Sequence, residues 1–352
     1  MTTTGNILLD IVIIVVKIAV ILGVNMLILT YMTLAERRVS AFMQDRLGPN
    51  RVGPMGLFQP FADGVKFIAK EDIIPAKADK AIYLMAPVLV FFSALITYAV
   101  IPVGPTFSAW GKTFQMSIAN LNVGILYIFA LTSFVVYGIA LAGWSSDSKY
   151  PLMGGLRSSA QMISYEISMG LAVIGVLMIV GSLRLNAIID FQASHLLWGF
   201  LPRWLVILQP LGFLIFLVAA FAETNRLPFD MPEAEPELVG GYHTEYGSMK
   251  FALFFMGEYA GLITSSALIT TLFFGGWDFP WVNESALGIW GVLLGIVAFS
   301  AKVGFFLFFY LWVRWTVPRF RFDQLMKLGW KYLLPLGLFN IVVTAIVMLF
   351  LA

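Results

Sequence analysis

Residues 211–237, LGFLIFLVAAFAETNRLPFDMPEAEPE, decide the fold, because an apolar run of membrane length stops there in a cluster of acids. Only 12% of the chain is charged, so carboxylates gathered in one place need an explanation. Solubility does not supply one, since a lipid-facing surface needs no charge. We expect the chemistry of the protein to lie in this stretch. Its six acids, counted as far as residue 245, are Glu223, Asp230, Glu233, Glu235, Glu237 and Glu245.

The composition is typical of proteins that cross a membrane many times. The chain has 352 residues, of which 60% are hydrophobic, and about 20 consecutive apolar residues span a bilayer as a helix. We predict an all-α integral membrane protein, a single polytopic domain over residues 1–352 with long cytoplasmic loops. The N-terminus lacks the basic region and cleavage site of a signal peptide, so the first span is expected to remain. The eight predicted spans are 11–34, 81–101, 121–142, 160–183, 204–222, 251–274, 287–313 and 332–351.

Lysine and arginine are divided unequally between the two faces. The connections after the first, third, fifth and seventh spans hold 17 of them, whereas the opposite face holds only Lys112, Arg184 and Arg203. Basic residues gather on the cytoplasmic side of membrane proteins. We therefore predict that both termini face outside and that the long connections face the cytoplasm or an equivalent matrix.

The first cytoplasmic connection, residues 35–80, carries a regular pattern. Between residues 55 and 70, polar side chains recur at helical spacing and apolar ones, such as Phe61 and Val65, take the opposite face. This pattern predicts an amphipathic helix in the plane of the membrane interface. One interpretation is a plain surface anchor. The preceding Gly-Pro-Asn-Arg turn at 48–51 favours a more constrained role, because glycine lets the backbone approach a ligand or a neighbour closely.

The acidic connection, residues 223–250, cannot form a long helix, because prolines at 228, 232 and 236 interrupt it. The glutamates at 233, 235 and 237 alternate, which suits an extended or turn-rich chain that lines a cavity.

Several kinds of site are excluded by what the chain lacks. It has no cysteine, which removes disulfides, thiolate metal sites and iron–sulfur ligation. Its two histidines, His195 and His243, fall on opposite faces of the predicted topology, so they cannot share a haem. No Gly-x-Gly-x-x-Gly or Walker loop is present. We predict no metal site, no nucleic-acid partner and no cofactor bound by this chain alone.

Four ionisable side chains fall within the predicted spans: Lys17, Glu166, Glu258 and Lys302. A charge at the centre of a spanning helix costs about 2.5–3.5 kcal/mol even on the lenient scale, which favours a functional role. Their graded depths predict a relay of titratable sites that runs inward from the cytoplasmic side. Two structural alternatives stay open. Lys17 can reach the outer surface with its long side chain, and Glu258 can form a structural pair with Lys302.

Several segments carry a resemblance to a known family. Residues Ala35 to Arg51 and Gly56 to Lys66 resemble the first loop of the quinone-site membrane subunit of respiratory complex I, the proton-translocating NADH:quinone oxidoreductase. The stretch from Ala222 to Tyr242, with Glu245-Tyr-Gly, is similar to the other signature of that family. Shorter matches lie at Ser164–Glu166 and Pro318–Leu325, so the resemblance covers nearly the whole chain.

The resemblance implies roles for particular residues. It implies a proton relay that includes Glu166, Glu223, Glu258 and Lys302. It also implies a quinone tunnel and acidic funnel formed by Glu36, Arg37, Arg46, Asp63, Arg157, Arg226, Asp230, Glu233, Glu235, Glu237, Glu245 and Arg314. Lys17 has no counterpart that we can place in the family.

The resemblance also implies partners and a location. Quinone is the substrate, and FMN and iron–sulfur clusters belong to partner subunits, since this chain has no thiolates to hold a cluster. The implied partners are the peripheral-arm quinone-site and iron–sulfur subunits, the other membrane-arm subunits and lipid, in the inner membrane of a bacterium. Membrane-bound hydrogenases carry a similar protein, so the electron donor stays open. Two competing hypotheses are a secondary ion transporter and a passive scaffold that docks a peripheral enzyme.

Overall fold

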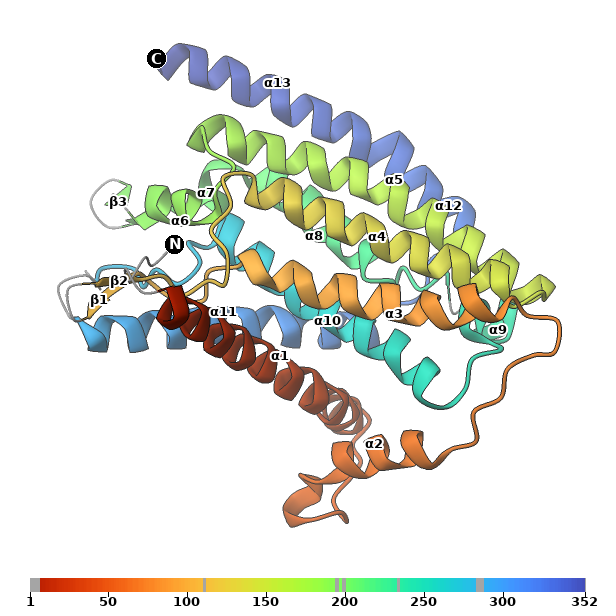
Figure 1. Cartoon of the computed structure of the whole chain (residues 1–352). Helices are drawn as coiled ribbons and strands as arrows, with labels where there is room; N and C mark the ends of the chain where they lie inside the picture. Colours follow the sequence, from red (N-terminus) through yellow and green to blue (C-terminus); the bar gives the residue numbers. More distant parts are fainter. Residues whose placement is uncertain are drawn as a thin grey trace.

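The computed structural model describes residues 7–109, 112–193, 196–197, 201–232, 235–282 and 288–351, and helices dominate it (Figure 1). The long helices are α1 (Ile7–Met43), α3 (Lys80–Thr97), α4 (Gly124–Ser145), α5 (Lys149–Val180), α10 (Ser248–Phe273), α11 (Ile289–Thr316) and α13 (Leu334–Leu351). The shorter helices are α2 (Gln59–Ala69), α6 (Leu185–Ala193), α7 (Leu205–Leu208), α8 (Pro210–Glu223), α9 (Glu235–Leu238) and α12 (Phe322–Lys327). Single turns are η1 (Pro54–Gly56), η2 (Tyr98–Val100) and η3 (Gly241–His243), and η5 (Leu328–Leu333) is π-helical.

Among the described residues, seven helices are long and apolar enough to cross a membrane. They begin and end at Asp10–Met43, Lys80–Val100, Gly124–Ser145, Lys149–Val180, Ser248–Phe273, Ile289–Thr316 and Phe322–Phe350. The predicted class, a largely helical protein that crosses the membrane several times, is therefore confirmed.

The predicted span 204–222 is not one continuous helix. It is divided at Gln209 into the four-residue α7 and the 14-residue α8. Pro210 causes the division, because it has no N–H to continue the bonding of α7 but is well suited to start a new helix. Hydropathy alone could not show this break, since the residues on both sides of it are apolar.

Other helices extend beyond the predicted spans. α1 continues to Met43, which places Glu36 on a helix and not in a loop. α5 begins at Lys149, so the connection predicted at 143–159 is reduced to residues 146–148. The predicted spans marked only the hydrocarbon part of each helix, and backbone hydrogen bonding continues through polar residues past that limit.

The helix predicted at 55–70 exists as α2, but it begins at Gln59. Gly53, Met55 and Gly56 all have positive φ angles, so the chain turns there and cannot be α-helical. The apolar side chains Phe61 and Val65 on α2 are exposed. α2 is fixed to α1 by the ion pair between Arg37 and Asp63.

Two short antiparallel hairpins lie at one end of the helical bundle, β1 (Phe107–Ala109) with β2 (Lys112–Phe114) and β3 (Leu196–Leu197) with β4 (Leu201–Pro202). Both chain termini lie toward this end, whereas α2 and α9 lie at the other (Figure 1). Lys17 of α1 donates to the carbonyl of Gln115, 2.9 Å away, just after β2. That contact favours the structural alternative for Lys17, a side chain that reaches the end of the bundle where the hairpins lie.

The helices pack around a large apolar core formed by α5, α8, α10 and α11, with α3 and α4 alongside. Glycines bring some of these helices very close. A Cβ on Gly143 of α4 would lie 2.5 Å from the carbonyl oxygen of Pro151 on α5. By contrast, only 6% of the apolar window of α1 is buried within this chain, so that helix stands at the margin of the bundle.

Candidate functional site

The candidate site is centred on Arg226, which follows the last turn of α8. Its side chain is only 5% exposed, and its Nε atom forms an ion pair with Glu258 of α10. Nη1 lies 3.4 Å from a carboxylate oxygen of Glu36, which comes from α1. Two acids that lie far apart in the sequence therefore share one buried cation.

Arg314 and Tyr259 also contact Glu36. Arg314, near the end of α11, forms an ion pair with Glu36. Tyr259 donates its hydroxyl to Glu36 at 2.6 Å, and the Arg226 guanidinium lies 4.4 Å from the Tyr259 ring centroid. We call Glu36, Arg226, Glu258 and Arg314 the charge cluster. Its two positive and two negative charges balance.

The electrostatics of the cluster keep Arg226 charged. Burial alone would lower the pKa of Arg226, but the neighbouring Glu258, Tyr259 and Glu36 outweigh it and hold the pKa above its ordinary value. Buried charges are costly to remove from water and persist only when well paired. A change of charge at one member therefore changes the electrostatic potential at the other three.

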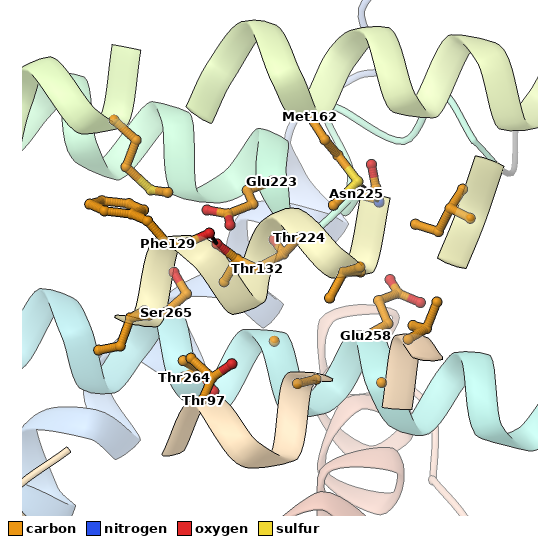
Figure 2. A pocket seen from close by; sticks show the side chains of 18 of the residues that line it. Thr97, Phe129, Thr132, Met162, Glu223, Thr224, Asn225, Glu258, Thr264 and Ser265 are labelled. Carbon is orange, nitrogen blue, oxygen red and sulfur yellow. Dashed lines mark hydrogen bonds between the residues drawn. The ribbon is translucent and has the colours of Figure 1, made fainter. Parts of the chain in front are cut away.

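A cavity of about 70 Å³ lies beside the cluster, between α3, α4, α5, α8 and α10. Figure 2 shows the carboxylates of Glu223 and Glu258 on its wall. Hydroxyl groups from three helices also line it, among them Thr97, Thr132 and Thr264. The buried Thr264 hydroxyl has no hydrogen-bond partner among the described residues. Most of the lining is apolar, so a water molecule in this cavity would bond to these hydroxyls or to the two carboxylates.

A second acid stands close to Glu223. Glu223 is hydrogen-bonded to Thr132 and interacts electrostatically with Glu166 of α5. The neighbouring hydroxyl, Ser133, donates to Glu166. Adjacent residues of α4 thus contact Glu223 and Glu166, so the structure brings three of the four predicted relay residues to one region.

The fourth predicted relay residue, Lys302, lies elsewhere. Its ammonium group donates to backbone carbonyls just after α10, the nearest in sequence to Glu258 being that of Phe274. Sixteen residues separate Glu258 from Phe274, which is about 24 Å along a helix at 1.5 Å per residue. The alternative of a structural pair between Glu258 and Lys302 is therefore wrong, and Glu258 pairs with Arg226 instead.

The first connection contributes a more exposed group of side chains. Arg37 and Asp63 form an ion pair at 2.6 Å, and Gln59 donates to the same carboxylate at 3.0 Å. Arg46 is exposed and donates to Gln44. Among the residues described, the structure thus groups Arg37 with Asp63 but leaves Arg46 apart from them.

The acidic connection, now residues 224–247, holds its acids in several separate contacts. Glu237 forms an ion pair with Arg157 of α5 at 2.6 Å. The backbone carbonyl of Asp230 accepts from Arg319. The carbonyl of Glu245 accepts from the Tyr83 hydroxyl at 2.6 Å. Glu233 and the side chain of Glu235 lie outside the described residues.

Sequence reasoning missed the polar side chains that contact the acids and the acidic connection. Tyr259 and Ser133 contact Glu36 and Glu166, and Gln161 of α5 holds the start of the acidic connection through the carbonyls of Ala222 and Phe229. The available signal was a polar residue inside an apolar run, as at Thr132 and Ser133. Such a polar residue indicates a functional site only when the helix that packs against it is known.

The comparisons with known proteins agree with one another. A family model described as NADH dehydrogenase matches residues 16–345. The chain is 53% identical over 332 residues to NADH-quinone oxidoreductase subunit 8 of Rhodothermus marinus, covering 92% of this chain and 94% of the relative. It is 49% identical over 336 residues to an NADH-quinone oxidoreductase subunit of Geobacter metallireducens, with 96% of each covered. With an NADH-quinone oxidoreductase subunit of Salinibacter ruber the identity is 50% over 334 residues, with 93% of each covered.

Proposed function

Because this chain belongs to the NADH dehydrogenase family and is a membrane subunit of the enzyme NADH-quinone oxidoreductase, we propose that it forms part of the quinone tunnel and couples quinone reduction to proton translocation. The observation that carries the proposal is the cavity between Glu223 and Glu258, with Glu258 also paired to the buried Arg226. The proposal is supported by this arrangement, in which Glu36 near the end of α1 shares Arg226 with Glu258, and Glu258 shares the cavity with Glu223.

The quinone head is proposed to bind where α1, α2 and the acidic connection meet. Arg314 supports this place, because it is the most exposed member of the charge cluster, at 20%. The exposed apolar residues of α2, Phe61 and Val65 among them, suit contact with a long apolar tail. Arg37, Arg46 and Asp63 would line the same region from the first connection. The chain has no cysteine, so FMN and iron–sulfur clusters are assigned to partner subunits.

Reduction to quinol takes two electrons and two protons and passes through negatively charged states. Such a charge near Arg314 and Arg226 competes with Glu36 and Glu258 for the guanidinium groups. A carboxylate that loses its cation binds a proton more readily. The charge cluster can therefore convert an electron-transfer event at the quinone into protonation of Glu258.

From Glu258 the proton change is proposed to continue through the cavity. Water bound to the cavity hydroxyls would connect Glu258 to Glu223, and the Thr132–Ser133 pair would connect Glu223 to Glu166. Glu166 would pass the change to the other membrane-arm subunits. The acids at 230, 233, 235, 237 and 245 would set the potential at the cytoplasmic mouth, together with Arg157.

The protein is a multi-pass membrane protein, and its orientation is part of the proposal. We count α7 and α8 together as an eighth crossing, which puts both termini on the periplasmic side of a bacterial inner membrane. α2 would lie in the cytoplasmic interface, where the peripheral-arm subunits dock. The basic residues of the first connection support this orientation.

The experiment that tests the function replaces Glu258 or Glu223 by glutamine in the whole enzyme. Glutamine keeps the shape of the acid but cannot release a proton, so we expect quinone-linked turnover to fall at least about tenfold, or about 1.4 kcal/mol. Electron transfer to a hydrophilic acceptor that bypasses the quinone should be unchanged. The control is Asp45→Asn, at an exposed residue of the first connection. Normal turnover and proton-to-electron ratio in the Glu223/Glu258 double variant would leave only a docking role.

A further inference from the structure

Lys302 is a charged residue of a spanning helix that the path above does not use. Its Nζ atom donates to the carbonyl oxygens of Phe274 at 2.8 Å, Gly276 at 3.0 Å and Asp278 at 2.6 Å. The three carbonyls belong to the short segment that follows α10. Lys302 of α11 thus caps the carboxyl end of α10.

The segment that receives Lys302 is shaped for this contact. Gly275 and Gly276 have φ angles of 71° and 54°, in the left-handed region that glycine adopts without strain. A Cβ on Gly276 would lie 2.5 Å from Ile189, so a side chain at this position would collide with Ile189. Gln192 fixes the turn from behind, since its Oε1 accepts from the backbone N–H of Gly275 at 3.0 Å.

The surroundings of the Lys302 ammonium attract a positive charge. The three carbonyls lie just beyond Phe273, at the carboxyl end of α10, where the helix dipole carries partial negative charge. The Trp204 ring centroid lies 4.9 Å from the ammonium, and the Asp278 carboxylate also attracts it. An ammonium has three N–H groups, and the three carbonyls accept three hydrogen bonds. These contacts hold the ammonium group in place.

The two helices that Lys302 joins also build the charge cluster. α10 supplies Glu258 and Tyr259, and α11 supplies Arg314, which meet at Glu36. Lys302 and Arg314 are 12 residues apart on α11, about 18 Å along the helix. The contact at Lys302 is therefore a second fixed point, far from the first, between the same two helices.

We propose that Lys302 is a positioning residue, a built-in cation that ties α11 to the carboxyl end of α10 and keeps both helices in the register that the charge cluster needs. This places it outside the proton relay. A slip of one residue between the helices would move Arg314 by about 1.5 Å relative to Glu258, enough to break ion pairs with the distances seen here.

The test compares variants of the whole enzyme in membranes and after purification. Lys302→Met removes the cation and leaves three carbonyls without their donor. We expect its thermal midpoint to fall by about 5 °C, its turnover to fall several-fold and its proton-to-electron ratio to stay unchanged. Lys302→Arg keeps a cation that does not release its proton, and we expect it to recover at least half of both losses. Lys17→Met is the matched control, because Lys17 makes one such carbonyl contact, and we expect a much smaller change.

Each outcome supports or overturns the assignment. A normal thermal midpoint with a reduced proton-to-electron ratio in Lys302→Met would make Lys302 a relay residue. Normal thermal midpoint, turnover and proton-to-electron ratio would show that Lys302 has neither a positioning role nor a relay role. If that variant does not assemble, the decision passes to Lys302→Arg and to Lys302→Ala supplied with propylammonium, which fits the space left by the side chain. Recovery of assembly in either supports the proposal, and failure of both overturns it. The thermal measurement does not depend on the function proposed above, whereas the turnover measurement rests on it, so the two can fail separately.

Discussion

Arg226 shows how much the environment of a residue decides its importance. It is one of 22 basic residues in the chain, yet it is almost fully buried and serves both Glu36 and Glu258. The ion pair between Arg37 and Asp63 is shorter than the contact to Glu36, but Arg37 is 50% exposed. Exposed pairs stabilise proteins by about 0–1 kcal/mol, whereas breaking a buried pair costs about 3–5 kcal/mol.

The first prediction concerns these two arginines. Arg226→Gln should strongly reduce the amount of assembled enzyme, because two buried carboxylates lose their cation, whereas Arg37→Gln should leave assembly near normal. Native gels of membranes and thermal inactivation of the purified enzyme measure the difference. The double variant Arg226→Leu with Glu258→Leu removes opposite charges together and should be more stable than Arg226→Gln. If Arg226→Gln and Arg37→Gln reduced assembly and thermal stability equally, burial within this chain would not explain the importance of the two arginines.

A pH dependence of stability follows from His243. Its ring packs against Tyr242, Phe251 and Phe255, and burial lowers the pKa of His243 to about 4. In the unfolded chain a histidine titrates near pH 6.5. The neutral ring therefore contributes its full stability above about pH 6.5, and that contribution is lost as the pH falls toward 4.

The measurement is the thermal midpoint of the purified enzyme at several pH values, for the natural chain and for His243→Phe. Between pH 7 and pH 5, the free energy of unfolding of the natural chain should fall by about 1–2 kcal/mol relative to that of the variant. Its thermal midpoint should fall accordingly. A constant difference across that range would mean that His243 titrates in the folded protein as it does in the unfolded one.

At the scale of the helices, the break that Pro210 causes between α7 and α8 is held by a well-defined set of contacts. Gln209 donates to Thr344 at 2.6 Å and accepts from Asn340 at 2.9 Å, so two side chains of α13 satisfy its amide. Gly175 of α5 leaves the space for this contact, since a Cβ there would lie 2.8 Å from the Asn340 amide nitrogen. Three helices thus depend on one buried polar contact.

Two glycines of α5 give a matched pair for testing that dependence. Gly175→Ala should lower the thermal midpoint of the enzyme, because the new methyl group collides with Asn340 or Gln209. Gly170→Ala should leave the midpoint unchanged or raise it slightly, because nothing lies within 4 Å of a Cβ there and alanine favours the helix. A midpoint in Gly175→Ala equal to that of Gly170→Ala would show that the polar contact can move at no cost.

The sequence predicts the helices well and their contacts poorly. The apolar runs located seven spanning helices, and the prolines at 228, 232 and 236 correctly excluded a long helix in the acidic connection, where α9 has only four residues. The start of α5 at Lys149 was missed, because its first turns carry polar residues. The partner of Glu258 was also missed. Helical depth placed Lys302 on the same path, whereas its long side chain reaches the far end of α10.

The candidate site was predictable as a set of residues but not as an arrangement. Resemblance gave Glu36, Arg226, Glu258 and Arg314 as separate members of two groups, the tunnel and the relay. Only the packing of α1, α10 and α11 around the end of α8 joins them in one cluster. Pairing between helices depends on which faces meet, and periodicity in a single chain does not determine that.

For the whole molecule, the proposed orientation can be tested by labelling. The chain has no cysteine, so a single cysteine introduced at an exposed residue would be its only thiol. In intact cells, a membrane-impermeant thiol reagent should label Trp281→Cys, on the side of the termini. It should label Leu47→Cys, in the first connection, only after the cells are opened. Labelling of Leu47→Cys in intact cells, with no labelling of Trp281→Cys, would reverse the orientation.

The contact between Gln209 and Asn340 also has a consequence for how the protein is made. The two residues are 131 positions apart, which a ribosome working at about 5–20 residues per second needs roughly 7–26 s to cover. Throughout that interval the Gln209 amide of the newly made α7–α8 segment lacks the two partners that it has in the folded protein. The 14 residues of α8 are also fewer than the usual membrane-spanning length. A helix made much later, α13, thus completes the insertion of an earlier segment, and chains that terminate before residue 340 should be recognised as unfinished and degraded.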